Sequence, residues 1–213
     1  MDRVWYVAYG SNLALARFRC YLSGGRPHGG ARVYPGCRDR SDPVRTAGVL
    51  IPGGLVFAGA SKVWGGGSAF YDPSAPGQVA ARAYLLTPGQ VGDVAAQEMR
   101  REPGGEFARD VAALLPDVDA IHTMGPGRYE TVVRLGVRDG VPMFTVTHDT
   151  PADLEPVAPT APYLRWIATG LIEAHGWALT RVIDYLHAAP GVGLAWTPGA
   201  LRSALDGDAG GGR

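Results

Sequence analysis

The sequence is poor in cysteine, with only Cys20 and Cys37 among its 213 residues. A small disulfide-stabilised fold needs several cysteine pairs, so that class is excluded and we expect both residues to be free thiols. A chain of this length can bury enough apolar surface to fold without crosslinks. We therefore expect one domain over residues 1–205, followed by a disordered glycine-rich tail over residues 206–213.

Neither sign of charge is in excess, because 20 lysine and arginine residues balance 20 aspartate and glutamate residues. A nucleic-acid or anionic membrane partner calls for a basic surface, and the sequence has no basic run of that kind. Long apolar runs are also missing, whereas a membrane-spanning helix needs about 20 such residues. We expect a cytoplasmic protein that binds a small molecule, with no nucleic-acid or membrane partner. The sequence does not define an oligomeric state.

Recognisable metal ligands and enzyme nucleophiles are lacking too. The histidines are scattered along the chain at His28, His122, His148, His175 and His187. None of them stands with other ligands at metal-binding spacing. No Gly-x-Ser-x-Gly segment occurs, and neither cysteine lies in a known nucleophile motif. We expect no metal, no cofactor and no covalent enzyme intermediate.

The sequence does contain many short β patterns separated by glycine and proline. The first, over residues 1–9, alternates apolar and polar residues and predicts a strand rather than a signal peptide. The other predicted strands cover residues 45–51, 55–61, 68–71, 78–86, 129–137 and 141–147. The spacing of the four that lie between residues 45 and 86 predicts an antiparallel meander, and the Asp139-Gly140 pair predicts a hairpin between the last two.

Helical patterns flank these strands. They cover residues 12–22, 104–115, 162–175 and 179–188, together with a helix that begins at Pro88 and ends near residue 101. Thr87 provides a cap for that helix, and Pro103 disfavours helical geometry just after it. Since strands dominate the middle and helices the end, we expect an α+β fold. Its core is a small mixed or antiparallel, barrel-like sheet with flanking helices.

A glycine-serine-asparagine turn follows the first predicted strand. Tyr9 ends the strand, and Gly10, Ser11 and Asn12 lead to Leu13 in the predicted helix. Backbone N–H groups at a helix start favour an anion, so the turn suits a substrate carboxylate. Glycine permits close approach or a positive φ, and Ser11 or Asn12 can cap the helix. From these residues alone, a plain helix cap and a binding loop remain alternatives.

The segment Val-Ala-Tyr-Gly-Ser-Asn-Leu over residues 7–13 resembles the signature of the γ-glutamyl cyclotransferase-like family. The resemblance implies that family's fold, and a substrate γ-glutamyl group bound by residues 9–13, chiefly through backbone groups. It also implies an enzyme of glutathione metabolism that needs no metal. Segments 24–43 and 104–127 exceed a compact member of the family, and their roles are not predicted.

Glu98 lies on the apolar face of the helix predicted after Pro88. At about 100° per residue, Val91, Ala95 and Glu98 share one side of that helix. A carboxylate partly withdrawn from water suits proton transfer, although a solvated glutamate paired with arginine is the alternative. Glu102 shares the face, and periodicity does not separate the two. The resemblance favours Glu98 as the acid and base, because the family's glutamate follows a strand and a short helix.

A looser match lies near the C-terminus, where Pro162-Tyr163-Leu164-Arg165 looks like the family's closing segment. Ala161 stands where the family usually has serine. The resemblance places Tyr163 among the substrate-binding residues, while packing in the core is an equal alternative for this side chain.

The reaction implied by the resemblance is intramolecular. The γ-glutamyl amine attacks its own γ-carbonyl, which closes 5-oxoproline and releases an amino acid or amine. One alternative is a non-catalytic binding or regulatory module that holds an acidic metabolite. Another is removal of a γ-glutamyl group from an amine or a biosynthetic intermediate. The sequence does not choose among these substrates.

Overall fold

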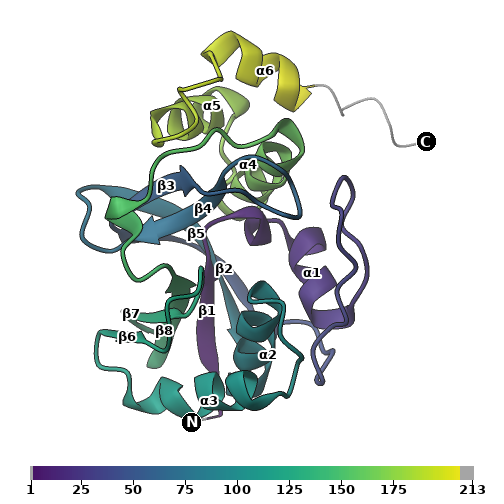
Figure 1. The fold of residues 1–213 in the computed structure, drawn as a ribbon, viewed down its shortest axis with the longest axis vertical. Coiled ribbons are helices and arrows are strands. Elements are labelled where there is room, and N and C mark those ends of the chain that lie inside the picture. The colour runs from purple at the N-terminus through teal and green to yellow at the C-terminus, as the bar shows by residue number, and fades with distance from the viewer. Residues whose placement is uncertain (1, 207–213) are drawn as a thin grey trace.

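Strand β1 (Val4–Ala8) lies inside a six-stranded sheet with the order β2-β5-β1-β8-β7-β6. In the computed structural model, which describes residues 2–206, β1 pairs antiparallel with β5 (Gln78–Leu86) and parallel with β8 (Val141–Thr147). The sheet is therefore mixed, and Figure 1 shows β1 running through the middle of the molecule. The tail expected over residues 206–213 lies outside the described residues, except for Asp206.

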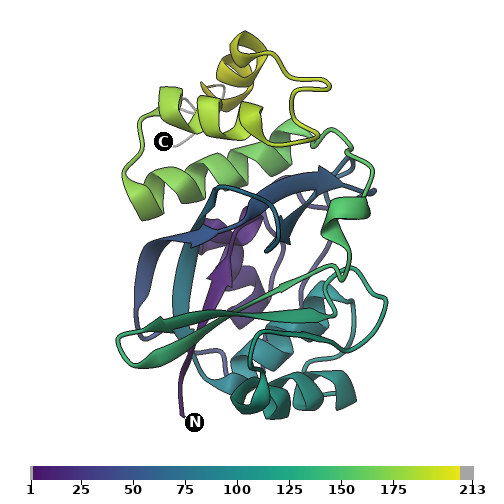
Figure 2. The same ribbon diagram turned by 90° about the vertical axis from the view of Figure 1, so that its left-hand side faces the viewer.

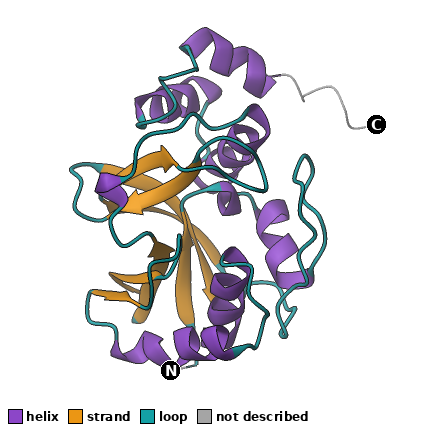
Figure 3. Ribbon diagram, viewed as in Figure 1, coloured by secondary structure: helices purple, strands orange, loops and turns teal. Residues whose placement is uncertain are grey.

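Both faces of this sheet are covered. Successive side chains of a strand point to opposite faces, and Tyr6 and Ala8 accordingly join one core with Phe18, whereas Trp5 and Val7 join the other. The first core is covered by α1 (Leu15–Ser23), α2 (Pro88–Glu98) and α3 (Glu106–Leu114). The second is covered by α4 (Ala161–His175), α5 (Leu179–Ala188) and α6 (Pro198–Asp206). Figures 2 and 3 show α4 to α6 gathered at one end and the strands between the two helix groups.

The α+β class and the mixed sheet with flanking helices are confirmed, but the barrel-like sheet is open, with β2 and β6 at its edges. The expected four-stranded meander is wrong. Strand β2 (Thr46–Pro52) pairs with β5, while β3 (Gly54–Ala58) and β4 (Ser68–Asp72) form a sheet of their own. The reason is a bend at two glycines joined by a backbone hydrogen bond, Gly53 with φ 128° and Gly77 with φ 116°. Both chain paths leave the large sheet there.

The hairpin prediction is confirmed. Strand β7 (Thr131–Arg138) turns into β8 through Asp139 and Gly140, both with positive φ, as a tight two-residue hairpin requires. The short helix η2 (Leu115–Asp117) and the edge strand β6 (Ile121–Thr123) precede this hairpin, and the sequence patterns predicted neither of them.

The helices differ from the sequence-based expectation mainly at their ends. The helix expected over residues 12–22 is broken at Ala14, whose ψ of 125° separates the short helix η1 (Ser11–Leu13) from α1. Helix α2 begins with the expected Thr87 cap but ends at Glu98 rather than near residue 101. Helices α4 and α5 are confirmed, joined through Gly176 with φ 64°. Helix α6 and the short helix η3 (Pro151–Asp153) were not predicted.

Cys20 and Cys37 are both free thiols, as expected. Within residues 2–206, no helix has the length and apolar character needed to cross a membrane.

Candidate functional site

A cavity of about 230 Å³ opens beside η1 and the C-terminal end of α2. Its other walls come from the segment between α1 and β2, the β3–β4 loop, Tyr129 and the first turn of α4. A second hollow of about 610 Å³ lies between the bend at Gly53 and the end of α5. Asp72 is the one charged residue lining that second hollow, and Ser74 hydrogen-bonds its carboxylate. Most of the charged side chains that line these two cavities therefore belong to the first.

Gly10 is needed at the cavity for close approach rather than for a positive φ. Its φ is −104°, and a Cβ placed on it would lie 3.0 Å from the Tyr163 hydroxyl oxygen. Neither Ser11 nor Asn12 caps a helix with its side chain. The helix-cap interpretation of this turn is therefore wrong for these side chains, which line the cavity instead.

Asn12 reaches across the cavity to Glu98. The Asn12 side-chain N–H donates to the Glu98 carboxylate at 2.8 Å, which joins residues 86 positions apart. The Asn12 Oδ1 atom is buried without a hydrogen-bond partner. Glu98 is half-buried and, among residues 2–206, is the only acidic residue on the cavity wall, whereas Glu102 is exposed and does not line it. The turn and the carboxylate thus present an acceptor each to the same space.

The position of Glu98 follows from how α2 ends. Arg100 adopts a left-handed conformation with φ 60°, while the Arg100 amide donates to the Gln97 carbonyl and the Arg101 amide to the Ala96 carbonyl. This pair of bonds closes a helix end at which glycine is the usual left-handed residue. The closure leaves Glu98 in the last turn, with its side chain at the cavity.

Tyr163 lines the cavity and is almost fully buried. The Ala69 amide donates to its hydroxyl oxygen at 3.1 Å, and its ring stacks on Trp64 at 5.8 Å between centroids. Burial raises the pKa of Tyr163 to about 12, despite the opposing effect of the Ala69 hydrogen bond. The phenol is therefore neutral near pH 7 and can donate a hydrogen bond.

Four further phenols on the cavity wall are also weaker acids than a free tyrosine. Burial raises the pKa of Tyr6, Tyr9, Tyr21 and Tyr129, so none supplies a negative charge near neutral pH. The Tyr9 hydroxyl donates to the Val146 carbonyl at 2.7 Å. Leu13 does not line the cavity; it is fully buried under the turn. Among the predicted binding residues, Leu13 is thus the one that lies apart from the cavity.

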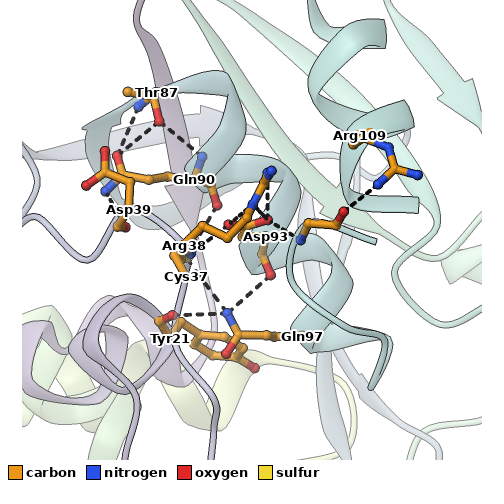
Figure 4. Close-up of polar contacts among 10 residues, drawn as sticks. Tyr21, Cys37, Arg38, Asp39, Thr87, Gln90, Asp93, Gln97 and Arg109 are labelled. Carbon is orange, nitrogen blue, oxygen red and sulfur yellow. Dashed lines mark hydrogen bonds and ion pairs between the residues drawn. The ribbon is translucent and has the colours of Figure 1, made fainter. Parts of the chain in front are cut away.

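The segment between α1 and β2 is fastened to α2 by buried polar side chains (Figure 4). The Asp93 carboxylate accepts hydrogen bonds from the Arg38 backbone and side chain and from the Gly104 backbone, at 2.7–3.2 Å. The buried Gln97 amide accepts from the Gly36 backbone and donates to the Tyr21 carbonyl. These contacts hold Tyr34, carried by the same segment, against the cavity.

We expect Asp93→Asn to lower the free energy of unfolding by about 2 kcal/mol, because asparagine replaces one of the two acceptor oxygens with an NH2 group and removes the charge that pairs with Arg38. Urea unfolding followed by circular dichroism measures this loss. Asp39→Asn is the matched control on the same segment; Asp39 is exposed, and its change should stay within about 0.5 kcal/mol. Equal stability of the two variants would contradict the role given to Asp93.

Cationic side chains of the cavity were not predicted from the sequence. They are Arg17, Arg32, Lys62, Arg100 and Arg128. Arg17 is only 2% exposed, and its guanidinium lies 4.6 Å from the ring centres of both Tyr21 and Tyr34. The one sequence signal for a buried Arg17 was its position four residues before Tyr21 in a predicted helix, with apolar residues on either side of it.

No family model matches the sequence. A curated relative, histone deacetylase 5 of Arabidopsis thaliana, is 36% identical over 152 residues, which is 68% of this chain. The chain spans only 23% of that relative's length. The matched region therefore concerns a part of a much longer protein.

Two solved structures share the fold. An uncharacterized protein from Homo sapiens aligns with a TM-score of 0.53 at 15% identity and covers 92% of each chain. A gamma-glutamyl cyclotransferase aligns with a TM-score of 0.52 at 16% identity and covers 89% of each chain. At this identity the likeness establishes the fold alone, and it agrees with the fold expected from the N-terminal segment.

Proposed function

We propose that this protein is a γ-glutamyl cyclotransferase, which converts the γ-glutamyl group of a small substrate into 5-oxoproline and releases an amine or amino acid. The hydrogen bond between Asn12 and Glu98 carries the proposal, because it sets the cavity's only carboxylate beside the Tyr-Gly-Ser-Asn turn. The fold shared with a gamma-glutamyl cyclotransferase supports it.

The substrate's α-ammonium group would lie between Glu98 and the unpartnered Oδ1 of Asn12, both of which accept hydrogen bonds. Glu98 takes a proton from the ammonium, and the freed amine attacks the γ-carbonyl carbon. A carbon–nitrogen bond forms within the substrate and closes a five-membered ring. The reaction is unimolecular once the substrate is folded correctly, so positioning supplies much of the rate.

Collapse of the tetrahedral intermediate breaks the bond to the leaving nitrogen. Glu98, now protonated, returns its proton to that nitrogen as it leaves. The ring nitrogen then loses its second proton to the released amine, so the products are the lactam N–H and an ammonium group, and Glu98 is again a carboxylate. The Tyr163 hydroxyl, held by the Ala69 amide, can donate to an oxygen of the substrate. Since the nucleophile belongs to the substrate, the scheme needs no serine or cysteine nucleophile.

The direct test is a mass-spectrometric assay of 5-oxoproline with a panel of γ-glutamyl dipeptides and γ-glutamyl amines. We expect at least one compound to give 5-oxoproline in proportion to enzyme concentration. If the whole panel yields none above the rate without enzyme, the proposed activity is wrong.

A second candidate is a domain that binds an acidic metabolite without converting it. The curated relative supports this second candidate, because the relative's name refers to a different reaction and this chain matches only 23% of the relative's length. Calorimetry with the same panel separates the two candidates. Binding without 5-oxoproline release supports the binding domain, and release supports the enzyme.

A further inference from the structure

The charges on the cavity wall are strongly one-sided. Five cationic side chains face one carboxylate, that of Glu98. Six arginines elsewhere in residues 2–206 do have carboxylate partners: Arg19 with Asp42, Arg38 with Asp93, Arg45 and Arg138 with Asp139, Arg82 with Glu173, and Arg101 with Glu130. In the same part of the chain, no ion pair involves the five cavity cations. The cavity therefore holds positive charge that the protein does not neutralise.

Buried polar atoms without partners gather at the same place. Of the five such side-chain atoms within residues 2–206, four belong to residues lining the cavity: Asn12 Oδ1, Arg17 Nε, Arg17 Nη1 and Arg128 Nη2. Buried polar groups are nearly always hydrogen-bonded, so a cluster of unpaired ones is typical of a binding site. The three nitrogens, on Arg17 and Arg128, are hydrogen-bond donors on cationic groups, so an anion is the ligand that they would bind.

Two of these cations are held in place by backbone carbonyls, which fix a guanidinium without cancelling its charge. Arg32 donates to the Gln97 carbonyl at 2.8 Å, and Arg128 donates to the Ala60 carbonyl at 3.0 Å. Arg17 donates to the Tyr34 hydroxyl at 2.8 Å. A guanidinium stays protonated in proteins, so each keeps its full charge when buried.

Arg100 adds an independent observation. Arg100 and Asp139 are the only two residues other than glycine with positive φ in the described part of the chain, and only Arg100 lines the cavity. Glycine is the favoured residue at such a helix end. An arginine in this conformation is strained, and strained residues cluster at functional sites.

Resting on the proposed function, we propose that the group released from the γ-carbonyl is anionic, and that Arg17 and Arg100 select it by its charge. A γ-glutamyl group brings one carboxylate and one ammonium, and the ammonium is matched by Glu98. The remaining positive charge is then available to the leaving part. The substrate class is a γ-glutamyl derivative of an acidic amino compound, in preference to a γ-glutamyl derivative of a simple amine.

The test uses three γ-glutamyl compounds that differ in the negative charge of the leaving part. γ-Glutamylethylamide carries none there, γ-glutamylglycine carries one negative charge, and γ-glutamylaspartate carries two. We expect KM to fall along the series, with about a tenfold difference between its ends. Added sodium chloride should raise KM for the aspartate compound more than for the ethylamide. Equal KM values, or a preference for the ethylamide, would overturn the proposal.

Arg100→Gly tests the residue itself. This variant should remove most of the KM advantage of the aspartate compound over the ethylamide, while its thermal midpoint stays equal or rises. Asp139→Gly is the matched control, because it changes the other non-glycine residue with positive φ. A lower thermal midpoint with an unchanged KM series would show that Arg100 acts only in structure. Arg17→Met should reduce the KM difference between the aspartate compound and the ethylamide further. If Arg17→Met does not fold, the result with Arg100→Gly tests the proposal.

The same series measured by calorimetry distinguishes this inference from the proposed function. Charge-dependent binding without any 5-oxoproline contradicts the cyclotransferase and keeps the anion-selective cavity. If 5-oxoproline forms at rates that do not depend on the charge of the leaving part, the cyclotransferase is kept and the anion-selective cavity is contradicted. Absence of both binding and turnover across the series overturns the two together.

Discussion

Replacing Glu98 with glutamine is expected to lower kcat for 5-oxoproline formation by about a thousandfold, the scale set by loss of a general acid–base group. The amide cannot take the proton from the substrate ammonium or return it to the leaving nitrogen. Glutamine keeps the shape of the side chain and an oxygen that can accept from Asn12, so the 2.8 Å contact can persist. The rate is measured by mass spectrometry with the panel compound that the wild type converts fastest.

Glu102→Gln is the matched control, because Glu102 was the competing candidate and is exposed away from the cavity. It should retain the wild-type rate. Thermal unfolding of both variants should show midpoints close to the wild type, which separates lost chemistry from lost structure. Wild-type turnover by Glu98→Gln, or loss of turnover in Glu102→Gln, would contradict the role of Glu98.

Gly170→Ala is expected to have the largest effect on the fold. A Cβ at this position in α4 would lie 2.3 Å from the Leu13 Cβ and 2.4 Å from the Ala14 nitrogen. One of these atoms belongs to the backbone, so no side-chain rotation relieves the clash, and α4 and η1 must separate. Overpacking of this kind costs about 3 kcal/mol. We expect that loss in urea unfolding, together with weaker substrate binding, since η1 carries Ser11 and Asn12.

Gly199→Ala is the matched control, because it is also a helical glycine, in α6, with open space around the new methyl group. It should be neutral or slightly stabilising, as alanine is the better helix former. If Gly170→Ala has the stability of the wild type, the close contact between α4 and η1 does not constrain the turn.

Much of the fold could be predicted because its signals are local. Thr87 and Pro88 define the start of α2, and Asp139-Gly140 defines the β7–β8 turn. The four-stranded meander was wrong because strand pairing depends on where two chain paths bend together. The bend at Gly53 and Gly77 involves glycines 24 positions apart, and nothing in either local sequence specifies that they meet.

The cavity was predictable only in part. Asn12 and Glu98 were named from a short motif and a helix face, yet their hydrogen bond depends on the whole sheet being formed. Arg17 was missed because arginine is rarely buried and its cage needs Tyr34 from another segment. Arg100 was missed because its left-handed conformation, which ends α2 early, has no signal in residue type.

The hydrogen bond from Asn12 to Glu98 also has a consequence for stability, because it links two segments that meet only in the folded chain. A ligand held between them binds the folded state and not the unfolded one. Its binding free energy therefore adds to the free energy of unfolding, by about 2.7 kcal/mol when its concentration is a hundred times Kd. In a cell, the fraction of the chain that escapes unfolding and proteolysis then rises with the supply of the metabolite. Abundance of the protein and availability of its ligand become coupled through folding alone.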